Sequence, residues 1–163
     1  MIRSVLVPAL VGLSLSTAAF AAPDTKVREI NVDIDITALT NAQAATRFAN
    51  MEADLENALT ARLVDRIAET GVRINVDISE VELSNSYTEN MGLAQTRLVG
   101  NVNVSDETNN SNYESYELTI NVETSRPFIP AGVDVTVLPV NSDVYYSAMI
   151  AAFADGVVKN LDD

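Results

Sequence analysis

Strict alternation of apolar and polar residues limits the fold of this chain more than any other feature. Between residues 29 and 36, apolar residues take every even position and polar residues every odd position. This period of two is typical of a strand that buries one face and exposes the other. The same alternation recurs, less strictly, at 72–78, 96–104 and 116–122. We therefore predict four strands, each with one face in a common core.

The pentapeptide INVDI occurs at 30–34 and again at 74–78, and the near copy INVET lies at 120–124. Because residues i and i+2 share a face of a strand, each copy would place an Asn beside an acidic residue. Asn is normally depleted in strands. In compatible register the copies predict an amide row beside a carboxylate row, made of Asn31, Asp33, Asn75, Asp77, Asn101, Asn121 and Glu123, with Asn103 as the alternative to Asn101.

Two interpretations of this polar face remain open. The functional one is a flat binding surface for a basic peptide, a sugar or a divalent cation. The other is a solvated face that short polar residues keep soluble, as is common where only one face of a sheet is covered. Arg73 and Arg97 would pair with some of the acids across strands under either interpretation.

Two helices are expected. The first begins at the capping box Thr40–Gln43 and ends at Gly71, with an apolar stripe that includes Met51, Val64 and Ile67. At roughly 43 Å it would be longer than a ten-residue strand, so either the helix bends or one end overhangs the sheet, and an overhang is a candidate contact surface. The second follows Ser142 or Asn141 and frays at its acidic end, and its apolar line is Tyr146, Ile150, Phe153, Val157 and Leu161.

The predicted element order is β-α-β-β-β-(β)-α, where the bracketed strand is a short edge strand at 133–139 ended by Pro139. The economical fold is α+β: a two-layer sandwich in which two helices cover one face of a mixed four- to five-stranded sheet. We expect the first two strands to be parallel and the later strands to form an antiparallel meander. The length favours a single domain over residues 22–163.

The N-terminus has the parts of a secretory signal peptide over residues 1–21. A basic residue, Arg3, precedes an apolar run that is too short to span a bilayer, and Ala19-Phe20-Ala21 follows as a cleavage site. No later segment is long and apolar enough to cross a membrane. We therefore expect an exported protein, in the periplasm or alternatively outside the cell.

Composition excludes several kinds of chemistry. The sequence has no histidine and no cysteine, so a Ser-His-Asp or Cys-His nucleophile and an ordinary zinc, copper or haem site cannot be built. The formal net charge of −13 repels nucleic acid. We expect no cofactor and no catalytic residues, although a carboxylate-dependent hydrolase, which needs only two acids in a cleft, stays the least favoured alternative.

The order of elements in this exported chain, with a second helix at the C-terminus, resembles that of small accessory proteins of the Gram-negative envelope. These include the lipopolysaccharide-assembly lipoprotein and transporter-auxiliary lipoproteins. The chain lacks their lipid-bearing cysteine, which argues against an outer-membrane anchor. The resemblance implies a non-enzymatic protein that binds another envelope protein, and it assigns no functional residue. A small-ligand, sugar or divalent-cation binding module is the alternative.

Overall fold

A computed structural model describes residues 25–34, 49–82, 97–109, 113–135, 137–139 and 142–162. Three features expected from the sequence lie outside these ranges: the signal peptide at 1–21, the capping box Thr40–Gln43, and Asn141 as a helix cap. They stay predictions.

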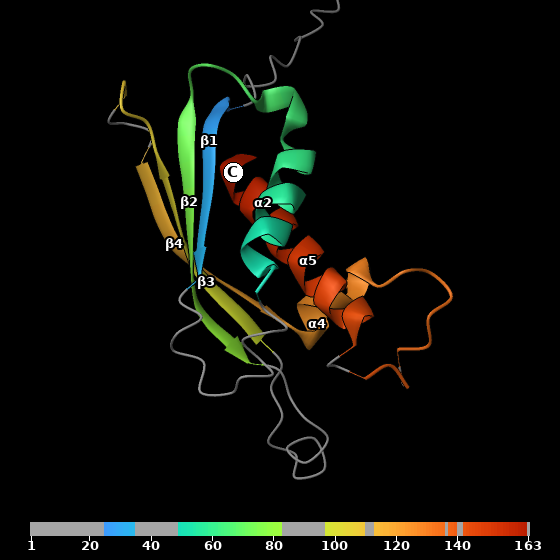
Figure 1. Ribbon diagram of the computed structural model, residues 1–163. Helices are drawn as coiled ribbons and strands as arrows, with labels where there is room; N and C mark the ends of the chain where they lie inside the picture. The colour runs from blue at the N-terminus through green and yellow to red at the C-terminus, as the bar shows by residue number, and fades with distance from the viewer. Residues whose placement is uncertain are drawn as a thin grey trace, which may run out of the picture.

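One sheet of four strands forms the first layer of the fold (Figure 1). The strands β1 and β2 are parallel, whereas β2, β3 and β4 form an antiparallel meander, as predicted. The order across the sheet follows the chain: β1 (Val27–Ile34), β2 (Val72–Glu82), β3 (Arg97–Ser105) and β4 (Tyr113–Asn121).

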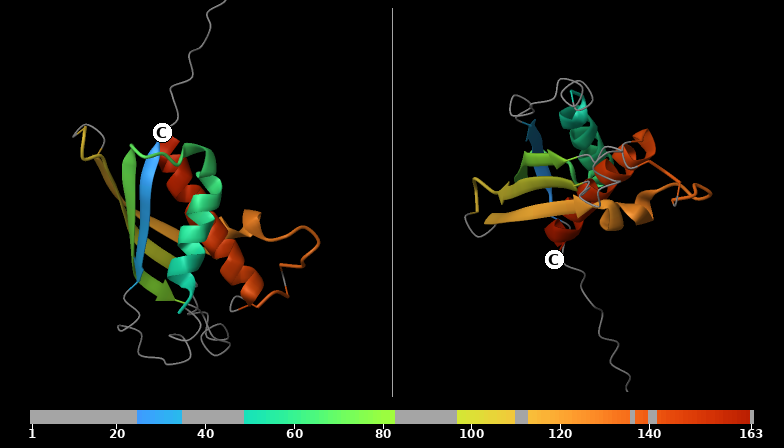
Figure 2. Two further views of the ribbon diagram at one scale, coloured as in Figure 1. Left: turned by 45° about the horizontal axis from the view of Figure 1, so that its top comes forward. Right: turned by 90° about the horizontal axis from the view of Figure 1, so that it is seen from below.

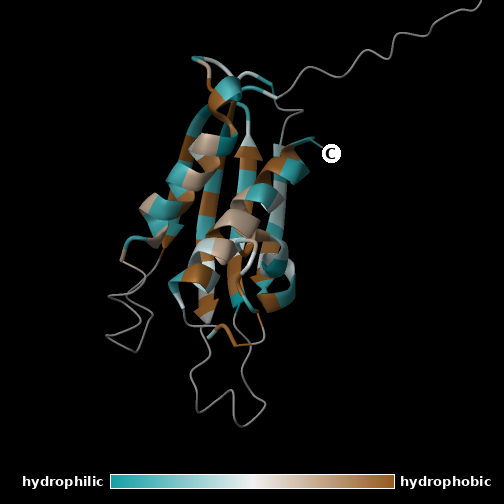
Figure 3. Ribbon diagram, turned by 90° about the vertical axis from the view of Figure 1, so that its right-hand side faces the viewer, coloured by the Kyte–Doolittle hydropathy of each residue, from teal (hydrophilic) through white to brown (hydrophobic). Residues whose placement is uncertain are grey.

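Helices α2 (Met51–Arg62) and α5 (Asp143–Asp162) form the second layer, on one face of the sheet (Figures 1 and 2). We call the covered face the inner face and the opposite one the outer face. Ile74 of β2, Leu55 of α2 and Phe153 of α5 are fully buried in one apolar cluster between the layers. The hydropathy colours alternate along the strands as this arrangement requires (Figure 3). The predicted two-layer α+β architecture is therefore confirmed.

A third, short helix was not predicted. The helix α4 (Val122–Ser125) and the 3₁₀ turn η3 (Arg126–Phe128) connect β4 to the segment that precedes α5. The predicted strand at 133–139 is wrong for the described residues of that segment, which form turns. The Val133 and Val137 amides donate 3.3 Å bonds to the Pro130 and Asp134 carbonyl oxygens, so they serve local turns in place of a strand ladder.

The first helix is shorter than predicted. It begins at Met51, ends at Arg62 and is followed by the 3₁₀ turn η2 (Val64–Arg66), so the expected end at Gly71 and the overhang are both wrong. Val64 and Ile67, expected in the buried stripe, are 63% and 46% exposed.

Pairing with the start of β1 explains this early end. The Ala68 and Val72 amides donate 2.9 Å bonds to the Val27 and Lys26 carbonyl oxygens, which draws the chain toward β1 and away from the helix axis. Gly71 has a φ of +147°, and a Cβ there would lie 2.3 Å from the Lys26 carbonyl oxygen. Gly71 is needed for this close backbone approach rather than for a helix end.

The second helix matches its predicted apolar line at Ile150, Phe153 and Val157, which are buried. The Ser142 hydroxyl accepts a 3.3 Å bond from the Tyr145 amide, as a helix cap does. The expected fraying of the acidic end is wrong, because α5 continues to Asp162, whose carboxylate forms an ion pair with Arg66. The described residues contain no helix that is both long and apolar enough to span a membrane.

Candidate functional site

The strand register sorts the polar residues of the outer face into three rows that run across the sheet. The ionic row is Glu29, Arg73, Ser105 and Tyr113. The amide row is Asn31, Asn75, Asn103 and Ser115. The acidic row is Asp33, Asp77, Asn101 and Glu117. In each row the residues are direct cross-strand partners from β1 to β4, so the predicted amide and carboxylate rows do form.

The ionic row is closely paired. Arg73 Nε lies 2.6 Å from Glu29 Oε2, and Arg73 Nη2 lies 3.2 Å from an oxygen of Glu107, in the chain between β3 and β4. Arg28 reaches the same Glu107 carboxylate at 3.1 Å. The register shift between Val27 and Glu29 adds one residue to β1, which brings Arg28 and Glu29 together at this network.

These contacts favour the charged forms of the two acids. The hydrogen bond from Arg73, and then the one from Asn31, hold the pKa of Glu29 below its ordinary value. The hydrogen bond and the charge of Arg28 do the same for the pKa of Glu107. Both carboxylates therefore stay ionised at neutral pH, with cations beside them that neutralise their charge.

The amide row is bonded internally. Asn31 Nδ2 donates to Asn75 Oδ1 at 3.1 Å and to Glu29 Oε1 at 3.2 Å, which also joins this row to the ionic row. At the other edge, Ser115 Oγ donates to Asn103 Oδ1 at 2.7 Å. The three Asn side chains are half-buried, and hydrogen bonds join the row as two pairs, Asn31 with Asn75 and Asn103 with Ser115, which we call the amide ladder. Much of their hydrogen-bonding capacity is thus used within the sheet.

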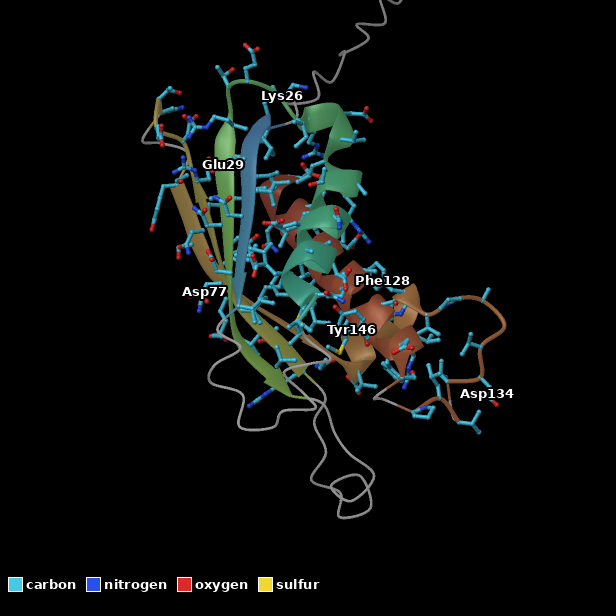
Figure 4. All side chains as sticks on the ribbon, in the orientation of Figure 1. Lys26, Glu29, Asp77, Phe128, Asp134 and Tyr146 are labelled. Carbon is cyan, nitrogen blue, oxygen red and sulfur yellow. The ribbon has the colours of Figure 1, made fainter. Side chains whose placement is uncertain are left out.

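The acidic row differs from the other two. All four of its side chains are exposed, and none has a hydrogen bond or ion pair to any residue that the structure describes. Asp33 lies directly opposite Asp77 on the neighbouring strand, and like charges in that position destabilise a sheet. Figure 4 shows Glu29 and Asp77 on the side of the sheet away from Tyr146 and Phe128. The row is an open line of uncompensated negative charge.

Two of the predicted row residues lie elsewhere. The near copy INVET does not fold as a strand throughout: β4 ends at Asn121, and Glu123 lies in the first turn of α4. Asn121 Oδ1 accepts bonds of 2.9 and 3.0 Å from the Glu123 and Thr124 amides, and the Thr124 hydroxyl accepts a 2.8 Å bond from the Asn121 amide. This reciprocal pair is a capping box, so Asn121 starts a helix.

The prediction also missed row members. It preferred Asn101 to Asn103 for the amide row, whereas the register places Asn103 there and Asn101 in the acidic row. Glu117 is the acidic-row residue of β4 and was not singled out. The alternation of β4 carried the signal for Glu117, since the residue lies at an odd, outward position. The predicted cross-strand pairing of Arg73 is confirmed.

The described side chains of the outer face offer mainly carboxylates, amides and hydroxyls for contact. Within the described ranges, no group of three or more His, Cys, Asp or Glu side chains is placed to hold a metal ion. Tyr116 lies on the inner face of β4, and burial raises its pKa to about 12, so its phenol stays protonated at neutral pH. The acidic row is a line spread over four strands, which can contact several cationic groups of a large partner at once.

A shallow groove of about 280 Å³ lies between α2 and α5. Its polar groups are already engaged: Tyr146 Oη donates to Asp54 Oδ2 at 2.6 Å, and Arg62 donates to the Ala58 and Ala151 carbonyl oxygens at 3.1 and 3.0 Å. The bond from Tyr146 to Asp54 and the bond from Arg62 to Ala151 connect the two helices, whereas the bond from Arg62 to Ala58 lies within α2. The groove contains none of the predicted site residues.

No family model matches this sequence, and no curated protein matches it. Several solved structures are similar in arrangement. PelC from Paraburkholderia phytofirmans, crystallised as a dodecamer, has 13% identity and a TM-score of 0.45, over 85% of this chain and 86% of that one. A minor lipoprotein from Acinetobacter baumannii has 14% identity and a TM-score of 0.39, over 83% and 92% of the two chains.

A DUF330 protein from Xanthomonas campestris has 13% identity and a TM-score of 0.40, over 85% of this chain and 80% of that one. None of these three is the lipopolysaccharide-assembly lipoprotein to which the element order was likened. The identities and TM-scores of these three structures are too low to transfer a function to this chain.

Proposed function

We propose that this chain is a non-enzymatic exported protein that binds another cell-envelope protein through the outer face of its sheet. The observation that carries the proposal is the contrast between the rows of that face. The ionic and amide rows are paired within the protein, whereas the acidic row has no partner among the described residues. A surface that only had to stay solvated would not need like charges on facing strands.

The chemistry of the row indicates what kind of partner fits. Asp33, Asp77 and Glu117 contribute three carboxylates on three strands, with the amide of Asn101 between the last two. A partner surface that carries several Lys or Arg side chains would relieve the repulsion and gain hydrogen bonds to these oxygens. The negative net charge would also speed the encounter with a basic partner.

Position-specific photo-crosslinking in cells tests the proposal. A photoreactive residue in place of Asn101 samples the outer face, and the same residue in place of Asp155 samples the exposed side of α5. We expect a discrete adduct with one envelope protein from position 101 and none from position 155. An adduct only from position 155, or from neither position, would contradict the proposal.

The ligand-binding alternative makes a different prediction. A sugar or divalent cation that binds only the folded state must raise the melting temperature, by an amount that grows with the logarithm of its concentration above Kd. The described residues hold no three-acid cluster that favours a cation. We expect thermal unfolding in calcium, magnesium or simple sugars to show no shift beyond that of a matched ionic-strength control.

A further inference from the structure

The two edges of the sheet are treated differently by the rest of the chain. Beside β1, helix α2 packs against the strand, and Glu56 Oε1 of that helix accepts a 3.4 Å bond from the Val32 amide. A side chain that occupies a strand amide in this way blunts the edge against further pairing. At the other edge, no strand of the described residues continues the sheet beyond β4.

Among the described residues, the β4 edge has one of the usual protective devices, its acidic side chains, and lacks the others. It is nine residues long, pairs with β3 without a register shift, and contains neither proline nor lysine. Bulges, prolines, charged side chains and covering elements are the common means by which proteins prevent strand addition. Negative charge alone repels acidic or neutral strands more than a strand of complementary, positive charge. Two acidic residues are the charges that β4 carries: Glu117 on the outer face and Glu114, three residues earlier, on the inner-face side.

Both carboxylates are available to a partner. Glu114 and Glu117 are exposed, and neither has an ion pair with a residue that the structure describes. Glu117 is also the residue at which the acidic row reaches the sheet edge. A strand laid along β4 would therefore meet negative charge on both of its faces, at positions three residues apart.

We propose that the β4 edge accepts an extended basic segment of a partner protein as a fifth strand. This inference rests on the proposed function and specifies its contact. The segment carries two Lys or Arg residues three positions apart, one opposite Glu114 and one opposite Glu117. Main-chain hydrogen bonds to the free edge of β4 supply affinity, and the two charge pairs supply register and selectivity.

A second copy of this chain fits the edge less well. Full-length antiparallel pairing of β4 with its own copy would place Glu117 opposite Glu117, because it is the central residue of the nine. Like charges directly opposite each other destabilise such a pair. Charge complementarity therefore favours a basic strand from another protein.

Hydrogen exchange with a synthetic peptide tests this contact directly. The probe is a nine-residue peptide of Thr and Val with Lys at every third position. It is added to the full protein, purified from the cells that express it. We expect the exchange of edge amides in β4 to slow by roughly tenfold or more, with no change in β1. A peptide of the same sequence with alternate amides N-methylated keeps its charge and should give no protection.

Matched charge variants separate the strand contact from general attraction. Glu114→Gln with Glu117→Gln should weaken peptide binding about two- to thirty-fold, as expected for the loss of two cross-strand ion pairs. Glu52→Gln with Glu69→Gln changes the net charge equally at exposed positions elsewhere and should leave affinity within about twofold.

The outcomes distinguish this inference from the proposed function. Equal protection by the N-methylated peptide, or equal weakening by both pairs of variants, would overturn strand addition. So would concentration-dependent dimerisation that protects β4 without peptide. If the adduct from position 101 persists in any of these cases, the outer face still binds an envelope protein, and only the fifth-strand contact is wrong.

Discussion

The two faces of the sheet share the same four strands and have opposite roles. On the inner face, Val32, Ile74 and Val102 are at most 2% exposed and pack in the core under α2 and α5. On the outer face, Asp33, Asp77 and Asn101 are exposed on the same strands. Burial of the inner face therefore determines whether the chain folds, and the residues of the outer face can vary with what that face contacts.

The largest change in the free energy of unfolding is expected for a substitution in the core under the inner face. Phe153 is fully buried, and its ring lies 2.9 Å from the position that a Cβ on Gly100 would take. Phe153→Ala should lower the free energy of unfolding by about 3–5 kcal/mol, through lost burial and a cavity. Asn101→Ala, at the next position on the outer face, should change it by less than about 0.5 kcal/mol in urea unfolding. Equal losses of stability in the two variants would contradict the different roles of the inner and outer faces.

A smaller difference in unfolding free energy is expected between variants of Asn121 and Asn75, which occupy the same position in the repeated pentapeptide. Asn121→Ala removes the cap of α4 and should cost about 1 kcal/mol of unfolding free energy. Asn75→Thr, within the amide row, exchanges one strand residue for a better strand former and should be close to neutral. Chemical denaturation of both variants checks the difference. A costly Asn75→Thr would mean that the amide ladder is a structural requirement.

The pH dependence of stability should report the ion pairs of the ionic row. Because the pKa values of Glu29 and Glu107 are lowered in the folded protein, their pairing stabilises it above the unfolded value of 4.5. That contribution is lost as pH falls through the lowered values. Arg73→Gln should therefore reduce stability modestly at neutral pH, and the difference in stability from the natural chain should close as the pH falls through the lowered pKa values. A gap that stays constant with pH would contradict this pairing.

The smallest effect on stability is expected in the acidic row, where a substitution should stabilise the protein instead of destabilising it. Asp77→Asn removes one of two facing carboxylates and should raise the free energy of unfolding by roughly 0.2–1 kcal/mol, an increase that added salt diminishes. Guanidinium is itself a salt, so urea unfolding at low ionic strength is the suitable measurement. A loss of stability would show that Asp77 has a favourable contact within the protein.

Much of the fold was predictable because the alternation of residues determines which strand face is buried. The four main strands, the parallel first pair and the two helices on one face all follow from residues such as Ile74 and Phe153. The length of the first helix was not predictable in the same way. Its periodic stripe continues to Ile67, but the sheet pairing of Val27 with residues near Gly71 competes with the helix and prevails.

The sequence predicted that rows of amides and carboxylates cross the sheet, but it assigned some residues to the wrong place. Period two places Asn31 beside Asp33 without any knowledge of the neighbouring strand. Register decides which residue of β3 joins which row, and it depends on turn geometry that a single strand does not encode. The case of INVET shows a further limit, since Thr124 three residues after Asn121 completes a helix cap that the strand pattern conceals.

Neutralising the acidic row shows whether its charge is what binds the partner protein to the outer face. Asp33→Asn, Asp77→Asn and Glu117→Gln together remove its charge, and Glu52→Gln, Glu69→Gln and Asp155→Asn remove the same charge at other exposed positions. The yield of the position-101 adduct in cells should fall roughly tenfold in the row variant and stay unchanged in the control, with both variants folded. An undiminished adduct from the row variant would show that the outer face binds its partner without the acidic row.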